Sequence, residues 1–381
     1  MKVTIFALHL GVGGVEKYVA TIANMLSEKH QVQIISTYKT TEKPAFYIND
    51  KVAVQYLIPY GPNGAEFKIA IKKKKFLRIL KEGMKSVKIL CLKKYRNIKT
   101  IKSQDCDVVI STRIFHNHLI QKYAKPDIVK ITTEHNHHNN NEKYIRQVCK
   151  SCKKFDYLLP ISRELTEFYA KRLDKTKVLY IPFCIEQPVK YKRKSSDVYQ
   201  FVTVGRLSPE KGILDLVDIF EEILKILPNA YLHIVGDGEE YKKIQAKIEY
   251  KNLENKVCMH GYMKKECIDE LYAQCDVYLM TSYTESFGFV LLEAMACGIP
   301  CVAFDSAQGA KEIIENNNNG FLIANRNKEK FIDKAVTLVR DKQRWIQMSE
   351  KAKYSVQTYS YSNTKEKWLQ LFDEINKRKM I

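Results

Sequence analysis

Two glutamates in the sequence TESFGFVLLEAMACGIP are the side chains of this chain best suited to chemistry. Glu285 and Glu293 lie eight positions apart in otherwise apolar sequence, with Gly288 between them. Buried carboxylates are costly unless a partner or a ligand pairs with them. On one continuous helix the two carboxylates would lie about 12 Å apart along the axis. We expect the helix to start near Phe289, so that Glu285 folds back from the loop while Glu293 rises from the first turns.

The loop between the glutamates also offers hydrogen-bond donors. The free N–H groups of Phe287, Gly288 and Phe289 would lie at the start of the expected helix, between the two carboxylates. Such a pocket would present acceptors for hydroxyl groups and donors for a phosphate in one place.

Two cations follow an earlier strand pattern, in the sequence VGRLSPEKG. Arg206 and Lys211 are separated by a Ser-Pro turn, so both side chains could leave the strand end toward one point. A guanidinium fork and a mobile ammonium together suit a diphosphate. The alternative is a structural ion pair between Arg206 and Glu210 or another acid. Sugar hydroxyls need acceptors and a diphosphate needs cations, so the two stretches together favour a sugar nucleotide.

A glycine turn follows the first apolar strand pattern of the chain. Gly11, Gly13 and Gly14 precede a helix expected to begin near Val15. Backbone N–H groups at a helix N-terminus form a ready anion site. The spacing is not G-x-G-x-x-G, because residue 16 is glutamate, so the alternative is a tight turn without a ligand.

Short β-branched or apolar runs alternate with helical ones, which predicts parallel sheets with crossover helices. In the first half the expected strands are 3–8, 32–36, 108–111, 129–133, 157–161 and 178–181, and the expected helices are 15–29, 117–125 and 163–173. In the second half the expected strands are 200–204, 231–235, 257–260, 277–280, 300–304 and 320–323, with a helix at 213–227 and a helical tail from about 328.

A chain of 381 residues is too long for one ordinary core, so we expect two domains. Residues 1–186 and 199–359 would each form an open α/β domain, joined by a polar linker at 187–198. In such sheets, ligands bind at the carboxyl ends of the strands, and between two facing domains that edge becomes a cleft.

Nearly all of the excess positive charge lies in the first half of the chain. Residues 1–190 carry 35 Lys and Arg against 16 Asp and Glu, a balance of +19, which leaves +1 of the total +20 for the remainder. The densest part, residues 68–102, has apolar side chains at roughly helical spacing between lysines. A basic amphipathic helix is typical of a membrane-surface element. The alternatives are a solvated lysine face and, third, a nucleic-acid surface, for which no recognised motif is present.

The composition, 45% hydrophobic and 28% charged, is that of a globular domain, and no run of about 18 apolar residues could span a bilayer. The N-terminus lacks a secretion signal, so we expect a cytosolic protein. The ten cysteines show one C-x-x-C pair, Cys149 and Cys152, and the histidine-rich run at 134–141 follows no zinc spacing. We expect reduced thiols and no metal site.

The second half also resembles a known family. The sequences TVGRLSPEKG, LHIVGDGEEY, TSYTESFGFVLLEAMACGIPCVA and NNGFLI resemble, in order and spacing, the retaining glycosyltransferases of family 4, and capsular or surface polysaccharide enzymes among them. These enzymes have the GT-B fold of two facing Rossmann-like domains. In the first half the likeness is limited to the Gly13-Gly14 turn and to TTEHN at 132–136. The chain departs from many relatives at Pro182-Phe183-Cys184 and at Gln308-Gly309-Ala310.

The resemblance implies roles for individual residues. Arg206 and Lys211 would hold the donor diphosphate, and Glu293 would bind the ribose hydroxyls. The transferred hexose would be bound by Glu285 with the amides of residues 287–289. The remaining implied contacts are His135 to the sugar and phosphate, the Gly13-Gly14 turn to the donor, and Gly261 and Tyr262 to the base.

Two further groups of residues have weaker assignments. His116 and His118 are candidate acceptor contacts on the segment before TTEHN. In the GT-B fold the last helix, here about 360–381, crosses back to the first domain, so Trp345 and Trp368 are expected to pack rather than to bind ligand.

The expected activity is a metal-independent, retaining transfer of a hexose or N-acetylhexosamine from a UDP-linked donor. The acceptor would be a lipid-linked glycan of surface polysaccharide synthesis, reached at the inner face of the membrane through residues 68–102, with no nucleic acid as partner. The alternatives are a nucleotide-sugar epimerase or glycogen-type synthase on the same fold, and a non-catalytic subunit that binds sugar nucleotides in an assembly complex.

Overall fold

The computed structural model describes residues 1–185 and 198–380. These residues form two compact units. Unit 1 consists of Met1–Ile181 and Lys365–Ile381, and unit 2 consists of Pro182–Thr364. The linker predicted at 187–198 lies outside the described residues, apart from Val198.

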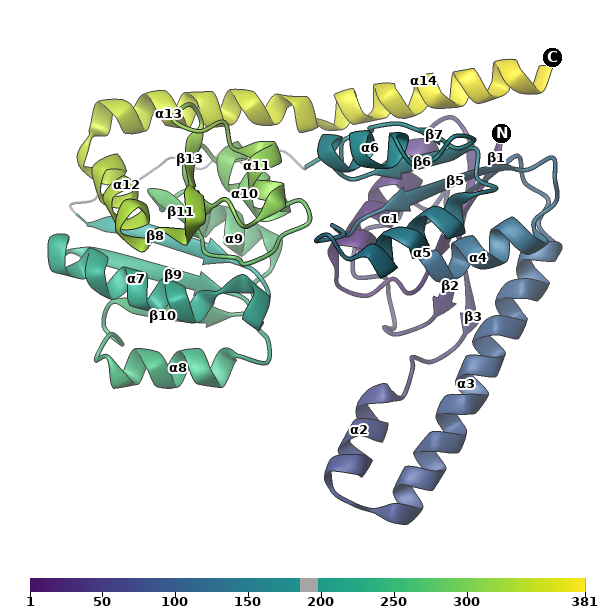
Figure 1. The fold of residues 1–381 in the computed structure, drawn as a ribbon, viewed down its shortest axis with the longest axis horizontal. Helices are drawn as coiled ribbons and strands as arrows, with labels where there is room; N and C mark the ends of the chain where they lie inside the picture. The colour runs from purple at the N-terminus through teal and green to yellow at the C-terminus, as the bar shows by residue number, and fades with distance from the viewer. Residues whose placement is uncertain (186–197, 381) are drawn as a thin grey trace. The chain divides into compact units, whose positions relative to one another are not determined.

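Unit 1 is built on a seven-stranded sheet in which all neighbouring strands are parallel, in the order β3-β2-β1-β4-β5-β6-β7 (Figure 1). The strands are β1 Lys2–Ala7, β2 Gln31–Tyr38, β3 Ala53–Ile58, β4 Val108–Ser111, β5 Val129–Glu134, β6 Tyr157–Pro160 and β7 Lys177–Val178. The helices are α1 Gly14–Leu26, α2 Gly64–Lys72, α3 Phe76–Lys102, α4 Ile114–Tyr123, α5 Glu142–Cys152, α6 Arg163–Ala170 and α14 Tyr361–Met380, whose residues from Lys365 on belong to this unit.

Unit 2 contains a six-stranded parallel sheet in the order β10-β9-β8-β11-β12-β13. The strands are β8 Tyr199–Val204, β9 Ala230–Val235, β10 Val257–Gly261, β11 Val277–Met280, β12 Cys301–Phe304 and β13 Gly320–Ile323. The helices are α7 Ile213–Ile226, α8 Tyr241–Tyr250, α9 Lys265–Tyr272, α10 Phe289–Ala296, α11 Gln308–Ile313, α12 Lys328–Arg340 and α13 Lys342–Ser355, with 3-10 turns at Pro209–Lys211, Ala324–Arg326 and Val356–Tyr359.

The prediction of two α/β, Rossmann-like domains with a helical tail is confirmed, and the expected strands match the observed ones to within a few residues. Strand β3 was not expected, because it is an edge strand whose side chains alternate between exposed and half-buried over most of its length. The strand expected at 178–181 is reduced to the two residues of β7. Helix α5 was not expected either; it starts where the side chain of Asn141 accepts a hydrogen bond from the N–H of Tyr144 at 3.0 Å.

The basic stretch forms two helices instead of the single helix expected at 68–102. Helix α2 ends at Lys72 and the 27-residue α3 begins at Phe76, so four consecutive lysines, 72–75, fall at the turn, where Lys74 adopts a left-handed φ of 51°. The two helices lie side by side as a hairpin (Figure 1). Asn63 ties them together, because its Nδ2 donates to the Glu82 carboxylate at 2.8 Å. We call residues 64–102 the basic hairpin.

Only the C-terminal part of the basic hairpin is packed into unit 1. Ile89 and Ile101 of α3 belong to the buried core of the sheet. Toward the turn, large apolar side chains are exposed to solvent: Ile69, Ile71, Phe76, Leu77, Leu80, Met84, Val87 and Leu90. Among the described residues, none of the helices is both long enough and apolar enough to cross a membrane.

The last helix, α14, completes the core of unit 1. Trp368 is fully buried, as expected for a packing residue, and Phe372 stacks on His30 with ring centroids 4.7 Å apart. Glu374 accepts hydrogen bonds from Tyr157 Oη at 3.1 Å and from Lys177 Nζ at 2.8 Å, which joins the helix to β6 and β7.

The burial of Trp368 predicts a large loss of stability in Trp368→Ala. Removing a fully buried aromatic side chain costs about 3–5 kcal/mol of unfolding free energy, measurable as a lower urea midpoint by circular dichroism. Tyr354→Ala is the control, since this side chain is 74% exposed on α13 and surface changes stay within about 0.5 kcal/mol. Equal midpoints for the two variants would show that α14 does not stabilise unit 1.

Candidate functional site

The two glutamates of unit 2 are separated by a break in the chain path, as predicted. Strand β11 ends at Met280 and helix α10 begins at Phe289. Gly288 caps the helix with a φ of 92° and a ψ of 50°, a left-handed conformation that favours glycine. Glu285 therefore lies in the loop, and Glu293 lies on the second turn of the helix.

Glu285 forms an ion pair with Lys211, 74 residues earlier in the chain. Strands β8 and β11 are neighbours in the sheet, so the loops that follow their carboxyl ends meet at one edge. Hydrogen bonds join these loops: Thr281 Oγ1 donates to the Gly212 carbonyl at 2.9 Å and to the Lys211 carbonyl at 3.3 Å, and the N–H of Tyr283 donates to the Glu210 carbonyl at 2.8 Å. The side chains of Lys211 and Glu285 are only 20% and 18% exposed, so the pair is held in a partly desolvated environment.

Arg206 pairs with a different carboxylate. Its guanidinium contacts Glu210 four residues later, which is the structural ion pair given as the alternative. The side chain of Arg206 is 70% exposed, and its Nε also donates to Ser208 Oγ at 3.3 Å. The structure thus places both expected phosphate ligands at the end of β8 but gives each its own acidic partner. The pKa of Glu210 is lowered: burial acts to raise it, but hydrogen bonds from Ser208 and the backbone and the charge of Arg206 outweigh that effect.

The loop residues 287–289 contribute backbone rather than side chains. Phe287 is buried and packs against Phe289 with ring centroids 5.1 Å apart. Phe289 in turn contacts Phe183 edge to face at 4.4 Å. The ring of Phe287 is therefore withdrawn from a ligand at this loop, whereas Phe289 is half-buried.

Glu293 and Tyr262 lie on other parts of unit 2 than the loops that carry Lys211 and Glu285. Glu293 is half-buried on α10, near the hydroxyl of Tyr272, whose pKa is raised first by burial, then by Tyr278 and then by the charge of Glu293. Tyr262 follows Gly261 at the end of β10 and is 69% exposed.

Unit 1 has its own cluster at the carboxyl ends of β1, β4 and β5. Glu16, on the first turn of α1, is buried and accepts a hydrogen bond from Arg113 Nη2 at 3.1 Å, with His9 Nε2 at 3.6 Å. Its carboxylate folds against the glycine turn, because a Cβ on Gly13 would lie 2.2 Å from Glu16 Oε2. Gly14 is the first residue of α1. A carboxylate of the chain itself thus lies at the turn where an anion was expected.

His135 follows β5 directly and is buried in this cluster. Its Nε2 lies 2.7 Å from Thr133 Oγ1, and its ring meets that of Tyr18 edge to face at 4.6 Å. Burial, and secondly the charge of Arg113, lower the pKa of His135 to about 3. The imidazole is therefore neutral near neutral pH and can exchange hydrogen bonds but carries no charge.

Sequence reasoning missed Glu16 and Arg113. Their only signal was position: Arg113 follows the strand 108–111, and Glu16 interrupts the glycine spacing at a helix start. Because charged residues at strand ends are common, their pairing could be found only once β1 and β4 were known to be neighbours.

The acceptor contact expected for His116 is not compatible with its position. His116 is completely buried on α4, with its ring against Phe6 and its Nε2 2.9 Å from Thr37 Oγ1. Burial, followed by the charges of Lys93 and Arg113, lowers its pKa to about 3. It is a core histidine. His118 is half-buried on the same helix, 3.2 Å from Gln121.

The side chains considered for metal binding are mostly engaged in packing. In the run 134–141, Glu134 accepts from Tyr144 Oη at 2.8 Å, and His138 packs against Phe168 with ring centroids 4.0 Å apart. Cys152 is a buried free thiol, and burial raises its pKa to about 12. All ten cysteines are free.

An Asp-x-Asp triplet, Asp105-Cys106-Asp107, immediately precedes β4. Asp105 accepts from Lys2 Nζ at 2.7 Å, and Asp107 accepts from the Lys2 N–H at 2.8 Å. The triplet therefore lies at the amino end of the strands, opposite to the edge that carries His135 and Arg113.

Comparisons with known proteins agree with this architecture. Residues 186–355 match the family model described as Glycosyl transferases group 1. The chain is 27% identical over 268 residues, 68% of its length, to the Poly(glycerol-phosphate) alpha-glucosyltransferase of Bacillus subtilis (strain 168). It is 24% identical over 378 residues to the GalNAc-alpha-(1->4)-GalNAc-alpha-(1->3)-diNAcBac-PP-undecaprenol alpha-1,4-N-acetyl-D-galactosaminyltransferase of Campylobacter jejuni, which covers 98% of this chain and 99% of that protein.

Among solved structures, a point mutant of Staphylococcus aureus TarM in complex with Fondaparinux, alpha-GlcNAc-glycerol and UDP superimposes with a TM-score of 0.77 at 16% identity, covering 97% of this chain and 99% of that one. The chain spans 40% and 41% of the lengths of two curated relatives that it matches, so it corresponds to part of those proteins. The chain thus has the GT-B fold, and the match to the group 1 glycosyl transferases lies within the sequence of unit 2.

The close packing of α11 against the loop that carries Glu285 predicts that position 309 requires glycine. A Cβ on Gly309 would lie 2.0 Å from the Phe287 carbonyl oxygen, and the Gly309 N–H donates to the Glu285 carbonyl at 2.9 Å. We expect Gly309→Ala to lower the unfolding free energy by about 1–3 kcal/mol, as overpacking does, measured by urea denaturation.

Gly64→Ala is the matched control for this prediction. A Cβ on Gly64, the first residue of α2, meets nothing within 4 Å, so the same substitution should be neutral or stabilise by up to about 1 kcal/mol. If both alanine variants unfold at the wild-type urea concentration, the close approach of α11 to the loop is wrong.

Proposed function

We propose that this chain is a retaining, metal-independent glycosyltransferase of family 4. It transfers a hexose or N-acetylhexosamine from a UDP-linked donor to a lipid-linked glycan acceptor in surface polysaccharide synthesis. The observation that carries the proposal is the Lys211–Glu285 pair, a cation and a carboxylate held together at the carboxyl edge of the sheet of unit 2. The group 1 family match over residues 186–355 and the names of the relatives support the activity.

In this mechanism Lys211 exchanges partners when the donor binds. The ammonium moves from the Glu285 carboxylate to the diphosphate, and Glu285 is released to accept hydrogen bonds from the sugar hydroxyls. Arg206 leaves Glu210 in the same way and adds a second cation. Negative charge develops on the departing phosphate, so these two cations and the N–H groups at the start of α10 stabilise the transition state. The acceptor hydroxyl loses its proton to that phosphate.

Glu293 is proposed to bind the ribose, and the exposed Tyr262 is proposed to lie beside the base. In unit 1, we assign a substrate contact to neutral His135 through its hydrogen-bonding imidazole, with Arg113 and Glu16 as the charged groups around it. The Gly13-Gly14 turn is available to a donor phosphate only if the Glu16 carboxylate moves away from it.

A second candidate function follows from the ion pairs themselves. Both expected phosphate ligands are already neutralised by acids of the chain, Lys211 by Glu285 and Arg206 by Glu210. That arrangement is also what a non-catalytic subunit with a structural ion-pair cluster would have. The two candidates differ in whether a sugar nucleotide displaces the acids, which a binding experiment decides.

The proposed roles predict different ligand responses in two glutamate variants, measured by thermal shift with UDP, GDP, ADP and UDP-sugars. A ligand at one hundred times its dissociation constant adds about 2.7 kcal/mol of stability, so UDP and one UDP-sugar should raise the melting temperature of the wild type. Glu293→Gln should lose the response to both, because the ribose is present in both ligands. Glu285→Gln should keep or increase the response to UDP, since Lys211 is freed, but gain nothing further from the sugar.

Glu254→Gln is the control, because this glutamate is exposed in the loop before β10. It should respond as the wild type does. If no nucleotide stabilises the wild type, the ion pairs are structural and the non-catalytic candidate is favoured. If UDP and UDP-sugar stabilise Glu293→Gln as well as the wild type, the ribose assignment is wrong.

We further propose that the basic hairpin docks the protein on anionic lipid at the inner face of the membrane, where a lipid-linked acceptor resides. Its turn combines four lysines with the exposed Phe76, Leu77 and Leu80. Apolar side chains can enter the headgroup boundary while lysines contact phosphates, and each basic residue near an anionic surface contributes about 1 kcal/mol.

Vesicle sedimentation tests this docking surface. The full chain should bind vesicles that contain phosphatidylglycerol and should not bind neutral phosphatidylcholine vesicles. It should dissociate from the anionic vesicles as the salt concentration rises, because salt screens the electrostatic attraction. The double variant Phe76→Ser and Leu77→Ser should bind more weakly at every salt concentration. Tyr250→Ser, which removes an 86% exposed ring in unit 2, should bind as the wild type does. Equal binding to both lipids, or no binding to either, would show that the basic hairpin is not a docking surface for anionic lipid.

A further inference from the structure

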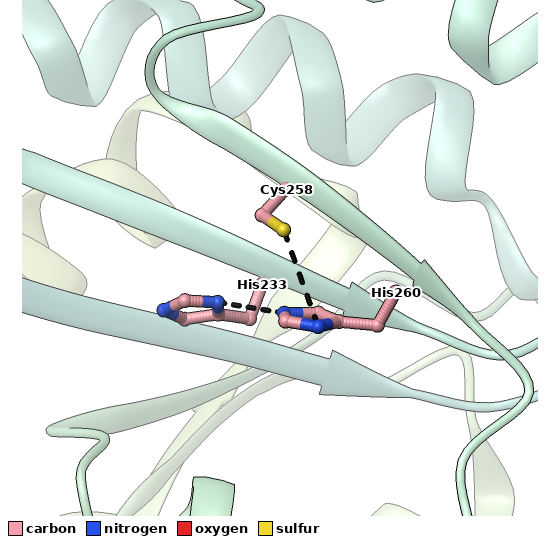
Figure 2. A group of neighbouring side chains, drawn as sticks. All are labelled: His233, Cys258 and His260. Carbon is pink, nitrogen blue, oxygen red and sulfur yellow. Dashed lines mark hydrogen bonds between the residues drawn. The ribbon is translucent and has the colours of Figure 1, made fainter.

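Three metal-ligand side chains meet on the two strands at one edge of the sheet of unit 2. His233 lies on β9, and Cys258 and His260 lie on the edge strand β10 (Figure 2). Leu232 and Ile234 face the core beneath the helices, so His233 points to the opposite face of the sheet. This cluster was not expected from the sequence, because His233 is 25 residues from Cys258 and 27 from His260 and meets them only through strand pairing.

The sheet register explains how the cluster forms. Cys258 is the strand partner of His233, and the register then shifts between Met259 and Gly261, so that His260 is the extra residue of a β-bulge. A bulge re-aims the side chain it carries. As a result, His260 comes within reach of both Cys258 and His233, as Figure 2 shows.

The ligand atoms are close to the spacing that Zn²⁺ needs. Nδ1 of His233 lies 2.9 Å from Nε2 of His260, and one ligand atom from each of the three residues falls within 4.8 Å of the others. Sγ of Cys258 lies 4.0 Å from Nδ1 of His260, the ring nitrogen that would not bind the ion. Tetrahedral Zn²⁺, with bonds of about 2.0–2.1 Å to nitrogen and about 2.3 Å to sulfur, sets ligand separations of about 3.3–3.6 Å. The two imidazoles need to open by a few tenths of an ångström, and the exposed thiol has to turn inward.

A neighbouring side chain already orients one ligand. Gln200 on β8 has its Oε1 2.8 Å from Nε2 of His233, so the amide oxygen accepts a hydrogen bond from the N–H at that nitrogen. This leaves the Nδ1 lone pair of His233 directed at His260. Fixing the tautomer and ring orientation of a metal-binding histidine through its other nitrogen is the usual part of an outer-shell residue.

The two imidazoles are half-buried. Burial, with the neighbouring His260 second, lowers the pKa of His233 to about 4, and burial lowers the pKa of His260.

We propose that His233, Cys258 and His260 form a Zn²⁺ site with one open coordination position. One nitrogen from each histidine and the Cys258 thiolate bind the ion, and water completes the tetrahedron. On binding, the thiol proton passes to solvent and the proton on Nε2 of His260 moves to its Nδ1, so that Nε2 becomes a ligand. The transfer reaction proposed above does not use this site. A bound metal ion would cross-link β9 and β10 just before Gly261 and Tyr262.

Co²⁺ and Zn²⁺ titration of the full-length, reduced protein tests the site. One equivalent of Co²⁺ should bind and give the visible absorption bands of tetrahedral Co²⁺ together with a thiolate charge-transfer band. Added Zn²⁺ should displace the Co²⁺ and abolish both signals. Cys258→Ser should lose the charge-transfer band and bind Zn²⁺ at least ten-fold more weakly. Since Cys258 is exposed, this variant should fold normally, which circular dichroism checks.

Two further variants separate a built site from adventitious binding. Cys267→Ser, which removes another exposed thiol, on α9, should leave the titration unchanged. Gln200→Ala should weaken Zn²⁺ binding by about 10- to 100-fold, as loss of an outer-shell partner does. Cobalt spectra that are the same in wild type and Cys258→Ser, or the absence of any tetrahedral spectrum in the wild type, would overturn the proposal.

Discussion

The ion pair between Lys211 and Glu285 is the interaction on which the proposed donor site of unit 2 depends. Partly buried carboxylates require a partner, and the parallel pairing of β8 with β11 supplies one from a loop 74 residues away. The same edge holds the left-handed Gly288 and the start of α10. A ligand that carries both hydroxyl and phosphate groups can replace each half of this pair with an equivalent contact, which is why we consider the pair to mark the donor site.

Unit 1 uses a related arrangement with a different electrostatic result. Its strand ends also bring a cation and a buried carboxylate together, Arg113 and Glu16, next to a glycine turn. The histidine beside them stays neutral, because burial and the nearby guanidinium both oppose a second positive charge. Much of the surplus charge of the first half lies on the basic hairpin, most of whose lysines are exposed to solvent.

The edge of the sheet in unit 2 presents a different kind of chemistry. On the face of β9 and β10 opposite to Leu232 and Ile234, the side chains of His233, Cys258 and His260 lie together, with His260 at the β-bulge. The hydrogen-bonded row Gln200, His233 and His260 crosses three neighbouring strands. This row lies on strand positions rather than on loops, so its geometry is fixed by the sheet.

The sequence alone determined the alternating α/β architecture, most strand positions, the break at Gly288 and the location of the basic stretch, because each depends on local periodicity or on a single residue's conformational preference. It left open whether Lys211 pairs with a distant acid, and it placed the core histidine His116 at a binding surface. Strand order decided those points, together with the Arg113–Glu16 contact and the His233, Cys258 and His260 cluster. Local patterns do not encode which strands become neighbours, since that follows from packing of the whole sheet.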